Sequence, residues 1–144
     1  MSGLPPIENL IPHRPPMLLI DEVIEHEGLR VVCRTTIRED MPFVQDGTVP
    51  VMLALELFAQ SAASLVALIA SRGGAPLSGG AILGSRQIDL HGESFSVGDV
   101  LEIHCEERMA LGMTAQIQCS LRREGELLAE GSINVMAGTP GGPS

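Results

Sequence analysis

A single carboxylate lies within an otherwise apolar stretch of this chain. Residues 49–70 would be hydrophobic on nearly every face of a helix, and Glu56 is the one ionisable residue among them. Gln60 follows four residues later, so both side chains share one helical face, about one turn apart. Burying a carboxylate is costly unless it is paired, hydrogen-bonded or neutralised. We therefore predict that Glu56 takes part in acid–base chemistry and that Gln60 positions it.

Both residues also have a structural interpretation, and two neighbours extend the candidate site. Glu56 could instead hold a loop by hydrogen bonds, and Gln60 could join the helix to a loop. Asp46 shortly precedes the expected helix and is predicted to cap it, with a catalytic role as the alternative. Val51 lies at the expected helix start, where its backbone N–H is predicted to polarise a substrate carbonyl.

The overall composition excludes several classes of function. The chain has 144 residues, 44% of them hydrophobic, which suffices for one domain with a real core. Its net charge is -9, whereas nucleic-acid binding needs a basic field. All nine basic residues are arginine, so Schiff-base chemistry and lysine general-base chemistry are excluded. Aromatic residues make up 2%, too few for a platform on which bases stack.

The cysteines and the N-terminus predict a cytoplasmic protein without a metal. Cys33, Cys105 and Cys119 are isolated from one another, which is neither a disulfide framework nor a zinc signature. The first residues carry neither a basic region nor an apolar run, so we expect no signal peptide. Glu56 and Gln60 interrupt the apolar stretch and no anchors flank it, which favours a buried helix over a membrane span. We expect no cofactor.

The hydrophobic periodicity predicts six strands and one long helix. The helix is expected over about residues 50–72, from Pro50 at its first position to a Gly-rich stop. Turns such as Glu124-Gly125 join neighbouring strands. The expected strands, several of which alternate apolar and polar residues, cover 17–25, 29–38, 81–90, 100–109, 113–122 and 127–136. Residues 1–136 are predicted to form one domain, and the Gly/Pro-rich tail 137–144 to be disordered.

This element order predicts an α+β fold of the hotdog type, in which a curved antiparallel sheet wraps around one central helix. An antiparallel sheet with one wet face needs cover on the other face, and the apolar helix can supply it. Unpaired edge strands favour pairing between two subunits, so we expect a homodimer.

Two motifs resemble one known family. The segment Pro12-His13-Arg14 leading into an apolar strand, and Glu56-Leu57-Phe58-Ala59-Gln60 on the helix, resemble the β-hydroxyacyl-carrier-protein dehydratases of the FabA/FabZ type. The resemblance covers roughly residues 7–136. It implies a hotdog dimer in which a loop histidine of one subunit and the helix glutamate of the other act on an acyl thioester held in a tunnel between the subunits.

The chain departs from that family at the loop before the helix. Counted back from Glu56 without gaps, the family's histidine falls on Pro42, and no histidine occurs between His26 and His91. The chain therefore resembles a divergent branch that lacks this histidine, some members of which accompany aryl-polyene or polyketide-like pathways. His13 is expected mainly to fix the first strand by hydrogen bonds, with a direct role in the site as the alternative.

The leading interpretation is a (3R)-hydroxyacyl-thioester dehydratase-like protein, weakly active or active only beside a histidine-bearing hotdog partner in a hetero-oligomer. Glu56 would protonate the leaving hydroxyl group. The acyl thioester would be carried by acyl carrier protein or coenzyme A, and Arg86 is a candidate contact for the carrier's phosphopantetheine. The alternatives are a hotdog thioesterase in which Glu56 activates water, a non-catalytic partner subunit, and an acyl-binding module.

Overall fold

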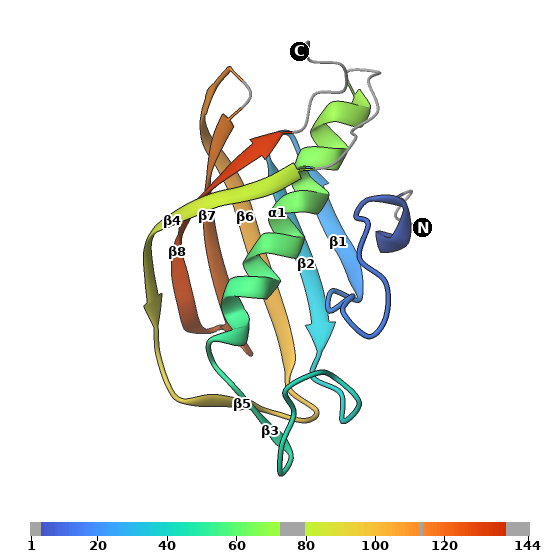
Figure 1. The fold of residues 1–144 in the computed structure, drawn as a ribbon, viewed down its shortest axis with the longest axis vertical. Coiled ribbons are helices and arrows are strands. Elements are labelled where there is room, and N and C mark those ends of the chain that lie inside the picture. Colours follow the sequence, from blue (N-terminus) through green and yellow to red (C-terminus); the bar gives the residue numbers. More distant parts are fainter. Residues whose placement is uncertain (1–3, 73–79, 113, 138–144) are drawn as a thin grey trace.

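A curved antiparallel sheet wraps around one long helix (Figure 1). The computed structural model describes residues 4–72, 80–112 and 114–137. In chain order, the elements are η1 (Ile7–Asn9), β1 (Glu22–Glu27), β2 (Arg30–Thr36), β3 (Thr48–Pro50), α1 (Leu53–Arg72), β4 (Gly80–Leu90), β5 (Ser94–Ser96), β6 (Val100–Leu111), β7 (Thr114–Arg123) and β8 (Glu126–Ala137). The strands β3 and β5 form a small pair of their own, which the sequence analysis did not anticipate.

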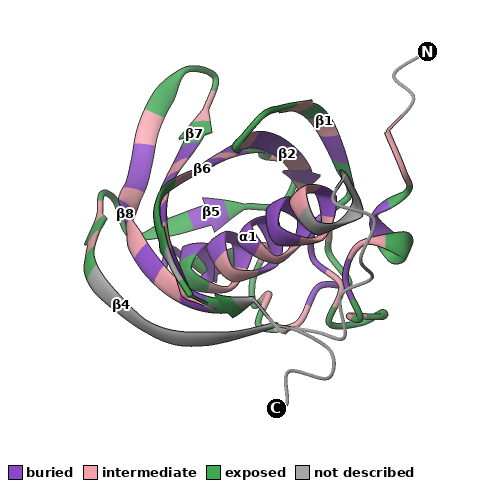
Figure 2. Cartoon of the chain, turned by 90° about the horizontal axis from the view of Figure 1, so that it is seen from above, coloured by how far each residue is buried: buried purple, intermediate pink, exposed green. Residues whose placement is uncertain are grey.

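The main sheet of the described chain holds six strands in the order β1-β2-β6-β7-β8-β4, all paired antiparallel. Seen from above, the sheet curls around α1, and the buried parts of the strands face the buried parts of the helix (Figure 2). This is the hotdog arrangement, so the predicted fold class is confirmed. The strands β1 and β4 form the two edges of the sheet.

The alternating sequence patterns correctly predicted which side chains form the core. Met113 lies outside the described residues. The other inward residues of β6 and β7 are buried, namely Leu101, Ile103, Cys105, Ala115, Ile117, Cys119 and Leu121. On the helix, Leu57, Phe58 and Leu65 are 0% exposed and pack against this layer. Each large apolar side chain removed from water stabilises the fold by about 1.5–3 kcal/mol. The core therefore fixes how α1 sits in the sheet.

The helix begins later than the sequence predicted. Pro50 was expected at its first position, but α1 starts at Leu53 and Pro50 ends β3. The backbone of residues 48–50 pairs with β5, with Val49 opposite Phe95. Because these backbone groups belong to a strand pair, they cannot begin the helix. The helix favoured by local sequence is shortened by three residues through a long-range pairing.

The first strand also begins later than expected. A strand was predicted over residues 17–25, but β1 covers Glu22–Glu27. Backbone groups of Met17 and Leu19 bind the side chain of Gln60 on the helix instead of a neighbouring strand. The apolar run is thus partly a connection that lies against the helix and only partly a strand.

At the other end, β8 runs through Ala137, one residue into the predicted tail, and residues 138–144 lie outside the described residues. Within the described ranges, no helix combines the length and the apolar character needed to cross a membrane.

Candidate active site

Glu56 lies in the first turn of α1, where His13 and Gln60 approach the same carboxylate oxygen. Nε2 of Gln60 donates a hydrogen bond to Oε2 of Glu56 at 2.9 Å. Nε2 of His13 lies 3.7 Å from that oxygen. The predicted pairing of Glu56 with Gln60 is present, and the long-range fold adds His13 to it. An acidic group at this end of a helix is also stabilised by the helix dipole.

The amide of Gln60 has a defined orientation because its other partners are backbone groups. Its Oε1 accepts a hydrogen bond from the Leu19 N–H at 2.9 Å, and its Nε2 donates to the Met17 carbonyl at 2.8 Å. A backbone N–H only donates and a carbonyl only accepts, so the amide cannot be turned over. Nε2 must therefore face Glu56. Gln60 is 0% exposed, and it both joins the helix to the 17–19 segment and positions the carboxylate.

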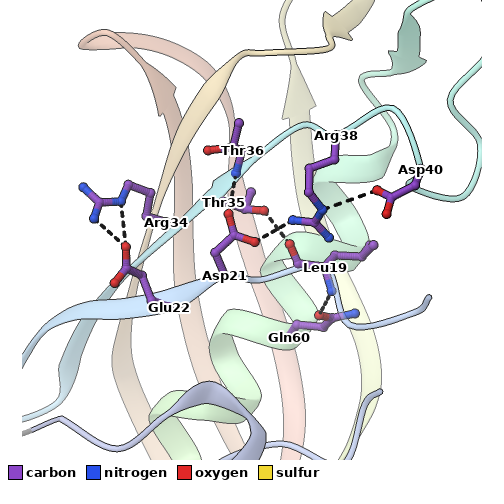
Figure 3. Close-up of polar contacts among 9 residues, drawn as sticks. All are labelled: Leu19, Asp21, Glu22, Arg34, Thr35, Thr36, Arg38, Asp40 and Gln60. Carbon is purple, nitrogen blue, oxygen red and sulfur yellow. Dashed lines mark hydrogen bonds and ion pairs between the residues drawn. The ribbon is translucent and has the colours of Figure 1, made fainter. Parts of the chain in front are cut away.

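Further polar contacts fasten the same segment to β2 (Figure 3). The Thr35 hydroxyl donates to the Leu19 carbonyl, and the carboxylate of Asp21 accepts from the Thr36 N–H at 2.9 Å and from Arg38 at 2.6 Å. Residues on β2 and on α1 thus hold the segment that precedes β1 in the chain. Figure 3 shows Gln60 and Thr35 reaching Leu19 from these two elements.

Replacing Gln60 tests the Gln60 clamp, the two hydrogen bonds that join its amide to the backbone of Met17 and Leu19. We expect Gln60→Ala to lower the free energy of unfolding by about 1–3 kcal/mol, because it leaves the buried Leu19 N–H without an acceptor. Urea unfolding of both proteins measures the difference. Gln45→Ala is the control, since Gln45 is exposed and its hydrogen bonds to described residues use only its backbone. Equal losses in the two variants would contradict the clamp.

Arg14 shapes the loop that carries His13. Its guanidinium donates to three backbone carbonyls, those of Glu8, Ile11 and His13, at 3.0, 3.0 and 2.6 Å. His13 was expected to fix the first strand through hydrogen bonds of its own. In the described structure its ring forms none, and Arg14 binds the carbonyl of His13 instead. The imidazole faces Glu56, as the alternative of a direct role in the site required.

The Glu56 carboxylate is less buried than its helix suggested. Its side chain is 40% exposed in the single chain and that of His13 is 32% exposed. The helical face around it is open as well, since Met52 and Leu55 are exposed and Ala59 is half-buried. These residues form an open strip on α1, on the side of the helix that the sheet of the same chain does not cover.

The predicted oxyanion donor is not available. The N–H of Val51 donates to the Glu93 carbonyl at 3.0 Å, because this backbone continues the pairing of β3 with β5. Assigning that role to Val51 was therefore wrong. The next two N–H groups, those of Met52 and Leu53, have no acceptor among the described residues. They are the first unpaired donors at the start of α1, about one turn before Glu56.

Comparison with known families shows to which family the chain belongs. The model of the ApeP-like family, described as ApeP dehydratase, matches residues 5–140. The chain belongs to the ApeP-like dehydratase family. It is also 33% identical, over 135 residues, to the 3-hydroxyacyl-[acyl-carrier-protein] dehydratase FabZ of Ruminiclostridium cellulolyticum, covering 88% of this chain and 91% of that protein. FabZ of Agrobacterium fabrum is 29% identical over 136 residues, covering 90% and 86%. The chain is thus a FabZ-like hydroxyacyl-thioester dehydratase homologue.

Solved structures agree with this family. A chain of the dehydratase heterocomplex ApeI:P from Xenorhabdus doucetiae superposes with a TM-score of 0.87 at 26% identity, covering 94% of this chain and 93% of that one. A hypothetical thioesterase with coenzyme A from Streptococcus pneumoniae superposes with a TM-score of 0.64 at 19% identity, covering 81% and 84%. The latter likeness shows the hotdog fold alone.

In this member of the ApeP-like family, Asp46 belongs to a tight turn of the loop before the helix. Gln45 and Thr48 exchange two backbone hydrogen bonds around Asp46 and Gly47, which both have positive φ. This is the two-residue hairpin that an Asp-Gly pair favours. The exposed Asp46 lies seven residues before Leu53 and, in the part of the chain that the structure describes, forms no hydrogen bond to the helix. The prediction that it caps α1 was wrong, because β3 separates the turn from the helix.

Pro42 and Phe43 lie in the same loop. Phe43 adopts a left-handed backbone conformation, with a φ of 73°, and its side chain is 67% exposed. A large apolar ring held outward at the rim of a loop is available to another molecule.

Arg86 is the arginine that was predicted to contact the carrier's phosphopantetheine. Arg86 lies in β4, where the pairing register with β8 shifts between Ser85 and Gln87. Its side chain is not among those that the structure describes. Its proposed phosphopantetheine contact stays a prediction. Arg123 pairs with Asp99 at 2.9 Å, and Arg14 is engaged with carbonyls.

The three cysteine thiols lie in the hydrophobic core. All three cysteines are buried and free. Burial raises the pKa of the Cys33 thiol, while the hydrogen bond to Cys119 and then burial raise the pKa of Cys105. Because the thiolate is the nucleophilic form, neither Cys33 nor Cys105 is suited to attack a thioester. No three metal-ligating side chains among the described residues form a group that could hold a metal ion.

Proposed function

We propose that this protein dehydrates (3R)-hydroxyacyl thioesters, with Glu56 as the group that protonates the leaving hydroxyl. The observation that carries the proposal is the carboxylate at the start of the central helix, aimed by Gln60 at 2.9 Å, in a chain of the ApeP-like dehydratase family. A fixed acid within reach of the β-hydroxyl is what the reaction needs. The carbonyl oxygen of the thioester would lie near the N–H groups of Met52 and Leu53.

The reaction needs a base as well as an acid. A base removes a proton from the α-carbon, and the C–H electrons form the C=C bond while the bond from the β-carbon to oxygen breaks. The hydroxyl takes a proton from Glu56 and leaves as water. Proton transfer by one positioned group contributes roughly 10²–10⁴-fold, so a site without a dedicated base is slow. Pro42 occupies the position of the family's loop histidine and cannot be that base.

We propose that the base comes from a histidine-bearing hotdog subunit that pairs with this chain. The ApeI:P assembly, to which this chain is similar, is a heterocomplex of dehydratases. The open strip on α1 supports the same arrangement, because Met52 and Leu55 leave apolar area in water beside the carboxylate. A subunit laid on that strip would cover it and bring its own loop near Glu56. By itself the chain would form the homodimer expected from its sheet edges.

Product analysis tests the proposed reaction. Hydroxyacyl thioesters carried by acyl carrier protein and by coenzyme A are incubated with the chain alone and with a histidine-bearing hotdog protein, and the products are separated by mass. We expect the enoyl thioester, formed with loss of one water. Free thiol together with the hydroxy acid would overturn the proposal in favour of a thioesterase. Unchanged substrate in every mixture would instead indicate an acyl-binding module.

A further inference from the structure

One nitrogen of the His13 imidazole is enclosed by the fold and has no partner in the described part of the chain. Its Nδ1 is buried and has no hydrogen-bond partner among the described residues, although the side chain as a whole is 32% exposed. Since atoms of the same chain already enclose Nδ1, neither water nor a second subunit can reach it. The other nitrogen, Nε2, lies 3.7 Å from Oε2 of Glu56.

This asymmetry decides where the ring keeps its proton. An N–H at Nδ1 would be a buried donor without an acceptor, which costs free energy. A proton on Nε2 instead points toward a carboxylate, the strongest type of acceptor available to it. The neutral tautomer protonated on Nε2 is therefore favoured over the neutral tautomer protonated on Nδ1.

The same arrangement makes the two oxygens of Glu56 different. Oε2 faces both Nε2 of Gln60 and Nε2 of His13, whereas Oε1 has no partner among the described residues. A carboxyl group whose one oxygen is held by two donors presents the other oxygen for proton transfer. Contacts of this kind are often long in the empty enzyme and shorten when substrate binds, so 3.7 Å is compatible with a working donor.

We infer that His13 is a positioning residue of the dehydratase site. It keeps its proton on Nε2, and this N–H donates a hydrogen bond to Oε2 of Glu56 within the same subunit. Oε1 is then left as the oxygen that exchanges protons with the substrate. The inference rests on the proposed function of Glu56. It assigns a second, intra-subunit histidine to a site whose loop histidine is replaced by Pro42. Arg14 and Gln60 serve this contact by holding the segments on either side of His13.

The tautomer of His13 can be measured without any turnover. A long-range ¹H–¹⁵N correlation spectrum of the imidazole rings, assigned by comparison with His13→Gln, distinguishes the two neutral tautomers and the charged ring. We expect the neutral ring to carry its proton on Nε2. A neutral ring that carries its proton on Nδ1 would overturn the inference whatever the activity is.

Kinetics in the assembly that turns over give the second measurement. In His13→Gln the amide nitrogen replaces Nε2 as a donor, whereas the shorter amide of His13→Asn replaces Nδ1. We expect His13→Asn to lower kcat roughly 10- to 100-fold with KM little changed, and His13→Gln to restore most of it. His91→Gln is the control, because His91 is exposed and, among the described residues, only its backbone forms a hydrogen bond. Thermal melts check that each variant is folded.

The outcomes separate the two proposals. If Glu56→Gln removes activity but His13→Asn keeps the parent kcat, the positioning role is wrong and the proposed function stands. If Glu56→Gln keeps full activity, the proposed function is wrong. Equal losses in His13→Asn and His13→Gln would show that a donor at Nε2 is not sufficient, which also overturns the positioning role.

Discussion

Glu56→Gln is expected to lower the rate of dehydration by roughly 10²–10⁴-fold, the contribution of one positioned acid–base group. The amide matches the carboxylate in shape, and its oxygen can still accept the hydrogen bond from Gln60. What is lost is the transferable proton. A coupled spectroscopic assay of enoyl-thioester formation, read as kcat and kcat/KM, measures the effect. A fall in kcat with unchanged KM is the signature of an interaction made in the transition state.

The control for this variant is Glu39→Gln, which makes the same chemical change at an exposed residue that forms no hydrogen bond or ion pair with the described residues. It should retain the parent rate. The half-exposed position of Glu56 also predicts that Glu56→Gln folds normally, with a melting temperature close to that of the parent. A fully active Glu56→Gln protein would remove this carboxylate from the mechanism. The thioesterase alternative, which relies on the same residue, would then fall as well.

Adding a histidine-bearing hotdog partner should raise the rate of dehydration by a similar factor, roughly 10²–10⁴-fold over the chain alone. The reason is the replacement of the family's loop histidine by Pro42, which leaves the chain without that base. The measurement is a titration of partner into a fixed amount of this chain, with the rate saturating at the stoichiometry of the complex. Analytical ultracentrifugation of the same mixtures shows whether a mixed assembly forms.

The matched control uses a partner whose own loop histidine is intact and a chain carrying Glu56→Gln. If the shared site is correct, this mixture assembles but loses the gain that depends on Glu56. A gain that survives Glu56→Gln would mean that the partner works alone and that this chain only supports it. Rapid turnover by the chain alone, unchanged by the partner, would show that another group has replaced the histidine. His13 would then be the first residue to replace.

Much of the fold followed from local patterns in the sequence. Alternation in residues 100–109 and 113–122 placed Ile103, Cys105 and Ile117 in the core, because neighbouring side chains of a strand point to opposite faces. The run of apolar residues around Leu57 required a buried helix. The four-residue spacing of Glu56 and Gln60 sufficed to predict that they meet, since it is a property of any helix.

Other features depended on pairings between distant parts of the chain. The pairing of β3 with β5 moved the start of the helix to Leu53 and engaged the Val51 N–H, and neither effect leaves a signal near residue 51. Asp46 matched a helix cap by its type and approximate position, yet its Asp-Gly turn serves a hairpin instead. In the first case a local preference was outweighed by hydrogen bonds to residues far along the chain, and in the second by those of a two-residue hairpin.

The candidate site shows the same division. The sequence by itself determined that a carboxylate and an amide share one face of a central helix, and that Pro42 stands where a loop histidine was expected. Only the tertiary structure brought His13 to 3.7 Å from Glu56, across more than forty residues, and enclosed its Nδ1. That contact exists because Gln60 binds the backbone at Met17 and Leu19. Backbone hydrogen bonds of this kind depend on position and leave no mark in the residue types involved.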